Sequence, residues 1–229
     1  MQRQTVQFHW HNATQHGHCF DSFDAFLASL SQDKRKKIKQ ERRRVADAGV
    51  TFRTAVGAAI TTADWDFFYQ CYERTYLEHG NAPYLSRSFF ERMQHDMPHN
   101  WVLFIAEKDS RPIASSLVAV QGLGTSQAVA YGRYWGALER VDCLHFEACY
   151  YQPLIWCITH GVQRFEGGAQ GEHKMARALM PVPTYSAHWL AHPAFADAVE
   201  RFLQRESAGV DNYLAHLAIR SPFKNHEPQ

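Results

Sequence analysis

Three glycines and five charged or titratable residues lie close together in the stretch FEGGAQGEHKMAR, at positions 165–177. Glu172 and His173 are residue types that accept a proton from an attacking amine. Lys174 and Arg177 are types that stabilise negative charge developing on a carbonyl oxygen. Together they suit the transfer of an acyl group to an amine. The alternative is a solvated turn and a helix start, in which Glu172 interacts favourably with the helix dipole.

The glycines of this stretch do not match the established nucleotide-binding loops. A Walker-type loop requires Gly, Lys and Ser or Thr in succession, whereas two residues separate Gly171 from Lys174. A dinucleotide-binding fingerprint requires G-x-G-x-x-G at the start of a helix, and only part of it is present. The sequence therefore disfavours a phosphate loop of either kind.

A second group of polar residues lies in HFEACYY, positions 145–151, near the start of a predicted helix. A carboxylate that enters aromatic surroundings is a candidate for a raised pKa, so Glu147 is the second candidate base. His145-x-Glu147 resembles the H-x-E of zinc deaminases, but no P-C-x-x-C follows, which excludes that site. The alternative for His145 and Tyr151 is a structural place at the edge of the core.

The third group lies on a predicted strand, YGRYWG, at positions 131–136. Strict alternation would place Tyr131, Arg133 and Trp135 on one face of the strand, with Gly132 and Tyr134 on the other. An arginine among aromatic rings either binds a substrate carboxylate or phosphate or only stacks on the rings. The residues leave both interpretations open.

A strongly basic run extends from Lys34 to Arg44, with eight cations in eleven positions and Glu41 as its one acid. Such a run creates a local field suited to tRNA, to an anionic glycolipid precursor or to a membrane surface. The alternative is a solvated helix face.

The N-terminal segment is rich in residue types that bind metals, namely His9, His11, His16, His18 and Cys19. Their spacing matches no established metal site, so we predict no metal ligands.

Composition limits the class of protein. The chain has 229 residues, a formal charge of +1, 45% hydrophobic and 21% charged residues, as expected for a soluble globular protein and not for one that coats nucleic acid. Its five cysteines form no C-x-x-C pair, which favours a reducing, cytoplasmic location. The N-terminus lacks an apolar signal region, and no apolar run approaches the ~18 residues of a membrane span.

The elements that must position these residues can be read from periodicity and from caps. Helices are predicted over 20–49, 61–80, 86–97 and 145–161, with two more over 192–219 separated near Gly209. A hairpin is predicted over 101–121, with strands over 126–137 and 162–168. Candidate helix caps are Asp21 or Ser22, Thr62, and Ser86 or Ser88. We predict an N-terminal aromatic and histidine-rich segment with the basic helix at 1–50, and a mixed α/β domain at 51–229.

Several stretches carry a family pattern: QFHWHN, FLASLSQDKRKKIKQERRRV, HGNAPYLSRSFF, YGRYWGALERVDCLHFEACYYQ and RFEGGAQGEHKMARALMPVPTYSAHWL. Together they resemble the FemAB-like predicted N-acyltransferases of bacteria, described as peptidoglycan biosynthesis or recognition proteins. The resemblance runs from Gln7 to Phe223 and is most specific between Tyr131 and Leu190. Members are usually longer at the N-terminus. The resemblance therefore implies that this chain corresponds to their C-terminal portion and acts with a partner domain or as a homo-oligomer.

The resemblance implies an α/β fold of the GNAT type, with a mixed, largely antiparallel sheet flanked by helices. It implies acyl-CoA or aminoacyl-tRNA as cosubstrate, no tightly bound cofactor, and an amine acceptor such as a peptidoglycan precursor. Fem-type proteins place a lysine after the corresponding strand and glycine turn, and Lys174 looks like its counterpart. Positions 164–169 also fit the R/Q-x-x-G-x-G/A element of CoA-dependent relatives. Because they follow the central predicted helix instead of preceding it, we interpret this match as a coincidence.

We therefore predict a cytoplasmic acyltransferase. The catalytic candidates are Glu172, His173, Lys174 and Glu147. The substrate-binding candidates are Arg133, Tyr134, Trp135, His145, Tyr151, Gln170 and Arg177. Two alternatives remain open: a non-catalytic module that binds peptidoglycan precursors, and a regulatory or structural half of a longer transferase.

Overall fold

A computed structural model describes residues 1–14, 16–168 and 171–224, in which seven strands form one sheet of order β2-β3-β4-β5-β6-β1-β7. The strands are β1 (Gln2–His11), β2 (Val50–Val56), β3 (Trp101–Lys108), β4 (Arg111–Gln121), β5 (Val129–Ala137), β6 (Arg164–Glu166) and β7 (Met180–Ala187). Neighbouring strands are antiparallel except β5 and β6, which run parallel. The predicted mixed, largely antiparallel sheet is confirmed.

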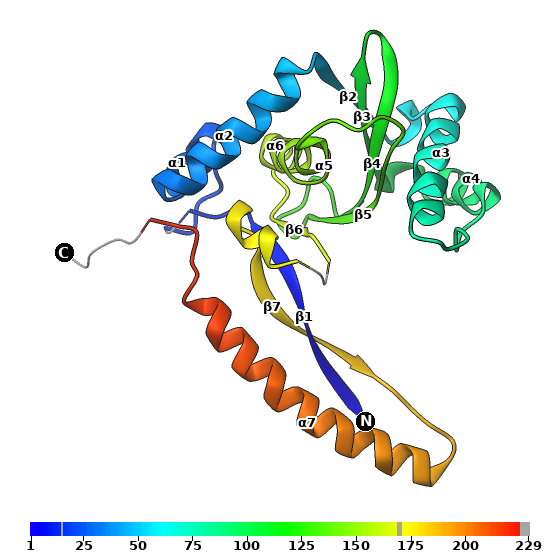
Figure 1. Ribbon diagram of the computed structural model, residues 1–229, viewed down its shortest axis with the longest axis vertical. Coiled ribbons are helices and arrows are strands. Elements are labelled where there is room, and N and C mark those ends of the chain that lie inside the picture. Colours follow the sequence, from blue (N-terminus) through cyan, green and yellow to red (C-terminus); the bar gives the residue numbers. More distant parts are fainter. Residues whose placement is uncertain (15, 169–170, 225–229) are drawn as a thin grey trace.

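Helices cover both faces of this sheet (Figure 1). α3 (Thr62–Glu78) and α4 (Arg87–Asp96) pack on one face. The other face carries α1 (Phe23–Ser29), α2 (Gln32–Asp47) and a central helix that joins α5 (Leu144–Phe146), the π-helical turn η3 (Glu147–Tyr151) and α6 (Gln152–Thr159). Short 3₁₀ turns occur at η1 (Gly57–Ala59), η2 (Pro98–Asn100) and η4 (Glu172–Arg177). The last helix is α7 (Pro193–Ala218).

The predicted hairpin at 101–121 is confirmed as β3 and β4. Asp109 and Ser110 form its two-residue turn, with φ values of 50° and 59°. Two successive positive φ values are the geometry that matches the twist of a tight hairpin.

The single helix predicted over 20–49 is wrong, because the chain is extended at Leu30, between α1 and α2. Leu30 is fully buried and pairs with Phe223 as an isolated bridge, so a tertiary contact interrupts a segment of helical composition. The start of α1 and the end of α2 agree with the predicted start and stop of this segment. Ser22 caps α1 by accepting the Ala25 N–H, and Gly49 ends α2 with φ 74°.

Two further caps can be compared with the predictions. The cap of α3 is Thr61 and not Thr62, because Thr61 forms a reciprocal capping box with Asp64. Ser86 caps α4, as predicted, by accepting the Phe89 N–H.

The division of the C-terminal segment near Gly209 is wrong, since α7 is continuous over 26 residues. The helix packs on β1, its Leu203 is buried, and Arg3 of β1 pairs with Glu206 at 2.7 Å. These contacts outweigh the ~1 kcal/mol that a glycine costs inside a helix. Figure 1 shows β1, β7 and α7 extending together as an arm, with the N-terminus near its far end.

Residues 1–50, predicted as a segment apart from 51–229, share one sheet with them. β1 lies between β6 and β7, pairing with β6 at His9–His11 and with β7 at Gln2–His9. Phe8 and Trp10 of β1 are each 1% exposed. The aromatic N-terminal segment thus contributes a core strand next to β6, which carries the chain to the glycine turn.

Gly136 and Gly209 make a matched test of how closely α3 approaches β5. An alanine Cβ at Gly136 on β5 would lie 1.9 Å from the Cys71 carbonyl oxygen of α3, whereas one at Gly209 would meet nothing within 4 Å. We expect Gly136→Ala to lower the free energy of unfolding by about 2 kcal/mol, and Gly209→Ala to raise it by about 0.5–1 kcal/mol. Urea denaturation measures both. Equal stability of the two variants would contradict the close approach of α3 to β5.

Within the described ranges, no helix is both long and apolar enough to cross a bilayer.

Candidate functional site

A cavity of about 290 Å³ opens where β5 and β6 separate. The two strands pair only at Val129–Tyr131 and Arg164–Glu166, and beyond this point the central helix and η4 form the other walls. The cavity is lined by Ser116, Gly132, Arg133, Tyr134, Trp135, His145, Cys149, Tyr150, Phe165, Gly167, His173 and Lys174. Six of the predicted site residues are therefore brought together: Arg133, Tyr134, Trp135, His145, His173 and Lys174.

A β-bulge at Arg133 shapes the β5 wall. Leu117 pairs with Tyr134 and Val118 pairs with Gly132, so Arg133 is the extra residue. Gly132 and Tyr134 were predicted on the same face of the strand, and this is wrong. The ring centroids of Tyr134 and Tyr72 lie 5.1 Å apart on the α3 side of the sheet, while Gly132 faces Phe165 on the other side. Arg133 is exposed at the cavity edge.

Lys174 is the most constrained cation of the cavity. Its side chain is buried, and Nζ donates to the carbonyl oxygens of Gly167 at 2.5 Å and Gly168 at 3.3 Å. An ammonium has three N–H donors, so one is left for a ligand. Burial lowers the pKa of Lys174. A Cβ at Gly167 would lie 2.4 Å from Leu179 Cδ2, so glycine permits the close packing of this turn.

Two histidines in the cavity favour their neutral form. His173 lies at the mouth, with Nε2 3.3 Å from the Tyr150 hydroxyl, and burial together with the cations Arg177 and Lys174 lowers its pKa. His145 lies between the rings of Trp135 and Tyr150, at 5.4 and 5.7 Å. Burial, followed by the charges of His173, Arg177 and Lys174, lowers the pKa of His145 to about 4. A neutral imidazole is able to accept a proton near pH 7.

The two glutamates predicted as bases lie away from this cavity. Glu172 accepts hydrogen bonds from the Tyr213 hydroxyl at 3.2 Å and from Arg220 at 2.7 Å. Glu147 is buried on the side of the central helix that faces α2, where Arg42 and Gln152 donate to its carboxylate. Burial raises the pKa of Glu147, and Arg42 opposes that rise. Neither carboxylate lines the cavity with Lys174.

Arg177 and Tyr151 lie behind the cavity wall. The Arg177 side chain is 2% exposed, and its nitrogens bond to Glu41, to the Tyr151 hydroxyl and to the His173 carbonyl oxygen. Tyr151 is fully buried and donates to Glu41. Neither residue lines the cavity, so the structure places them as support for it. Gln170 lies outside the described residues.

Six lining residues were not among the predicted site residues, including Ser116, Cys149, Tyr150 and Phe165. Cys149 lies four residues after His145, a helical spacing that could have indicated a shared face. Ser116 is opposite Trp135 in the β4–β5 register, and Phe165 follows from β6. The last two depend on strand pairing, which the sequence does not reveal.

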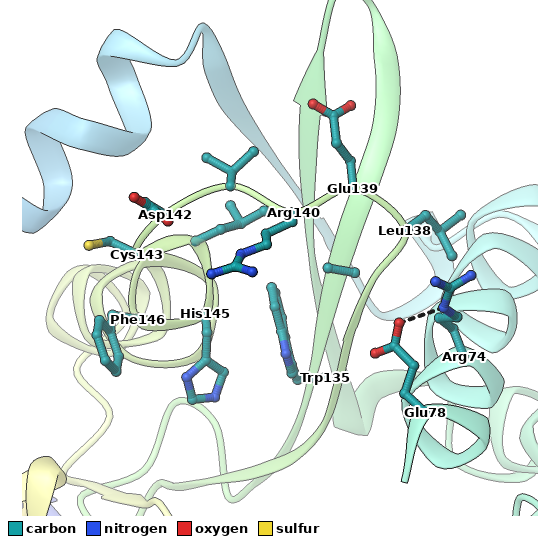
Figure 2. A pocket seen from close by; sticks show the side chains of 13 residues that line it. Arg74, Glu78, Trp135, Leu138, Glu139, Arg140, Asp142, Cys143, His145 and Phe146 are labelled. Atoms are coloured by element: carbon teal, nitrogen blue, oxygen red, sulfur yellow. Dashed lines mark hydrogen bonds and ion pairs between the residues drawn. The ribbon is translucent and has the colours of Figure 1, made fainter. Parts of the chain in front are cut away.

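A larger groove of about 640 Å³ lies next to the cavity and shares Trp135 and His145 with it. Figure 2 shows these two rings beside the loop that carries Glu139, Arg140 and Asp142. Three carboxylates line the groove, from Glu78, Glu139 and Asp142, against two guanidinium groups, from Arg74 and Arg140, and Arg74 is already paired with Glu78. The groove therefore lacks the excess of positive charge that a pyrophosphate prefers.

In its described residues, the histidine-rich N-terminus shows no metal-like arrangement. His9 Nε2 lies 3.3 Å from Gln7 Oε1 and 3.8 Å from a Glu166 carboxylate oxygen. Among the residues that the structure describes, no group of three or more His, Cys, Asp or Glu side chains is placed to hold a metal ion.

The chain matches a family model over residues 1–225, that of the FemAB-like proteins, described as peptidoglycan biosynthesis/recognition. No curated protein matches the sequence. Among solved structures, the chain is similar to FemX, with 11% identity, a TM-score of 0.54, and 78% of this chain and 59% of that chain covered.

Two further solved structures are similar as well, one of them named as a lysylphosphatidylglycerol synthetase. For the C-terminal domain of a protein named as such a synthetase from Agrobacterium fabrum, identity is 12%, the TM-score 0.54, and coverage 80% of this chain and 60% of that chain. For L-PGS from Bacillus licheniformis, identity is 9%, the TM-score 0.55, and coverage 88% of this chain and 67% of that chain. The chain thus spans 59% to 60% of the length of the first two structures. These likenesses show a shared fold, and the family match confirms the resemblance in the sequence: the chain belongs to the FemAB-like family.

Proposed function

We propose that this protein is a transferase that moves an acyl or aminoacyl group to an amine within the cavity between β5 and β6. The observation that supports this most directly is the ammonium of Lys174, fixed by two backbone carbonyls at the wall of a cavity that also contains two imidazoles. Such an arrangement offers a fixed donor for an oxyanion beside groups able to take a proton.

Each step can be assigned to a residue. The acceptor amine attacks the donor carbonyl, a C–N bond forms, and the oxyanion accepts a hydrogen bond from Lys174. His173, whose Nε2 lies 3.3 Å from the Tyr150 hydroxyl, takes the proton that the amine loses. Collapse of the intermediate breaks the C–S bond of a thioester or the C–O bond of an ester. The proton held by His173 then passes to the leaving thiolate or alkoxide.

The charge distribution favours aminoacyl-tRNA over acyl-CoA as the donor. Arg42 pairs with Glu147, while the other cations of α2 have no ion pair among the described residues: Lys34, Arg35, Lys36, Lys37, Lys39, Arg43 and Arg44. A helix of this charge attracts a polyanion, whereas the groove beside the cavity carries more carboxylates than cations. The family description supports an amine of a peptidoglycan precursor as the acceptor.

A transfer assay tests this proposal. The whole chain is incubated with acyl-CoA or aminoacyl-tRNA and with peptidoglycan-precursor amines, and the N-acylated product is detected by mass spectrometry. We expect product from at least one donor. Thermal shifts complement the assay, because a ligand at a hundred times its Kd stabilises the fold by about 2.7 kcal/mol. Precursor binding without turnover from any donor would instead favour a binding module. Turnover only after addition of a separate chain would favour half of a longer transferase.

Filling the cavity is expected to block donor binding. Burial raises the pKa of the Cys149 thiol to about 12, so it lines the cavity as a small neutral group. Cys149→Phe places a ring in a space of about 290 Å³, and we expect the thermal shift from the donor to require at least about ten-fold more ligand. Cys19→Phe, at an exposed thiol, is the matched control. Equal shifts for both variants would show that the donor binds elsewhere.

A further inference from the structure

The one acid in the basic run of α2 is buried and connects the helix to the wall of the cavity. Glu41 accepts a hydrogen bond from Arg177 at 2.7 Å and another from the Tyr151 hydroxyl. The side chains of the ion pair are 8% and 2% exposed. Because η4 carries both His173 and Arg177, α2 holds the segment that presents His173 and Lys174.

Every nitrogen of the Arg177 guanidinium has a partner. Nη2 donates to Glu41, Nε to Tyr151 at 3.0 Å, and Nη1 to the carbonyl oxygen of His173 at 2.8 Å. The guanidinium carbon lies 3.6 Å from the centroid of the Phe146 ring. With three directional bonds and one stacking contact, the position of Arg177 is fixed, and so is the backbone at His173.

The segment η4 has few hydrogen bonds of its own, and its other contacts lead away from α2: Lys174 bonds to the glycine turn, Glu172 to Tyr213 and Arg220, and Met175 packs in the core. It has six residues of 3₁₀ helix, it begins after Gly171 at φ 103°, and it ends at Ala178 at φ 62°. A 3₁₀ turn of this length contributes few hydrogen bonds of its own. The ion pair connects η4 to α2, and Arg177 also holds the backbone carbonyl oxygen of His173 directly.

The next residue of α2 makes a second connection to the site. Arg42 donates to Glu147 of the π-helical turn, which also carries Cys149 and Tyr150 into the cavity. Two successive residues of α2 therefore hold the two segments on either side of the His173–Tyr150 contact.

We propose that Glu41 and Arg177 are positioning residues: their buried ion pair anchors η4 to α2 and so sets the place of His173 and Lys174 in the cavity. The part of this inference that concerns turnover rests on the proposed function. We expect the pair to contribute little to stability as such. Replacing a buried ion pair by apolar side chains of similar volume is often neutral or stabilising, whereas removing one partner leaves an uncompensated buried charge. Removing both partners therefore separates positioning from folding.

The test uses the triple variant Glu41→Leu/Tyr151→Phe/Arg177→Met of the whole chain, because the buried Tyr151 hydroxyl bonds to both members of the pair and would otherwise lose both partners. Hydrogen exchange is followed at the amides of Lys174, Ala178 and Leu179, which bond within and next to η4. We expect these amides to exchange at least about ten-fold faster, while the urea midpoint stays close to that of the unmodified protein. We expect kcat to fall by about a hundred-fold with KM for the donor little changed, because a small misplacement of reacting groups has this effect.

The control, Arg3→Met/Glu206→Leu, removes an ion pair of the same length on the arm. It should change neither the exchange rates at η4 nor kcat. Unchanged exchange at η4 in the triple variant would overturn the inference, as would faster exchange with an unchanged kcat. If the unmodified protein turns over no donor, the proposed function fails. The exchange rates then decide by themselves whether the pair anchors η4.

Discussion

Replacing Lys174 by methionine is expected to lower kcat for acyl transfer by about 10²- to 10³-fold, the effect of removing one preorganised oxyanion donor. The Lys174 ammonium is held by the carbonyl oxygens of Gly167 and Gly168, so its remaining N–H does not have to reorient when charge develops. A donor of this kind acts mainly on the transition state. KM for the donor should therefore change much less than kcat.

Steady-state kinetics with the donor found in the transfer assay measures this effect. Lys108→Met is the matched control, because Lys108 pairs with Glu139 at a partly exposed position outside the cavity. Lys174→Arg adds a second test, since the planar guanidinium fork does not replace a point charge between two carbonyls. We expect it to stay at least about ten-fold below the unmodified protein in kcat. Full activity of Lys174→Met, with an unchanged circular dichroism spectrum, would remove Lys174 from the mechanism.

The central strands β3 to β6 could be predicted from the sequence because their signals are local, whereas β1, β2 and β7 were not predicted. The β3–β4 hairpin follows from two apolar runs around a polar turn, and β6 from a short run before two glycines. Lys174, His173 and His145 were singled out by residue type and by family resemblance. They meet because the parallel strands β5 and β6 separate beside the central helix. The prediction included six residues that line the cavity, but also Glu147, Tyr151, Glu172 and Arg177, which do not line it.

The side of η4 on which each residue lies was not predictable from residue type. Within η4, Lys174, Met175 and Arg177 are buried while Glu172 and His173 are exposed, so a three-residue spacing alone does not predict which side is covered. Arg177 looks like a surface residue in a charged stretch, yet its partner Glu41 lies 136 positions earlier in the chain. Likewise, nothing in YGRYWG shows that Arg133 is a bulge, because a bulge is a property of two strands together.

Acid is expected to destabilise the protein through His145. In the folded protein the pKa of His145 is about 4, against an ordinary value of 6.5. The unfolded chain therefore binds the proton more tightly. The contribution to stability is complete above pH 6.5 and is lost as the pH falls toward 4. A difference of this size corresponds to about 3 kcal/mol in the free energy of unfolding, of which about 2 kcal/mol is lost by pH 5.

Urea denaturation at pH 7.5 and pH 5 measures this loss, and His145→Phe isolates it. Phenylalanine retains a ring between Trp135 and Tyr150 but has no titrating group. His9, His11 and His173 also have lowered pKa values and remain in both proteins, so the difference between the two proteins reports His145. We expect His145→Phe to lose about 2 kcal/mol less than the unmodified protein over this interval. An equal loss would mean that His145 is protonated in the folded state at pH 5. The wall between the cavity and the neighbouring groove would then be open to water, and a cation at His145 would compete with Lys174 for the oxyanion.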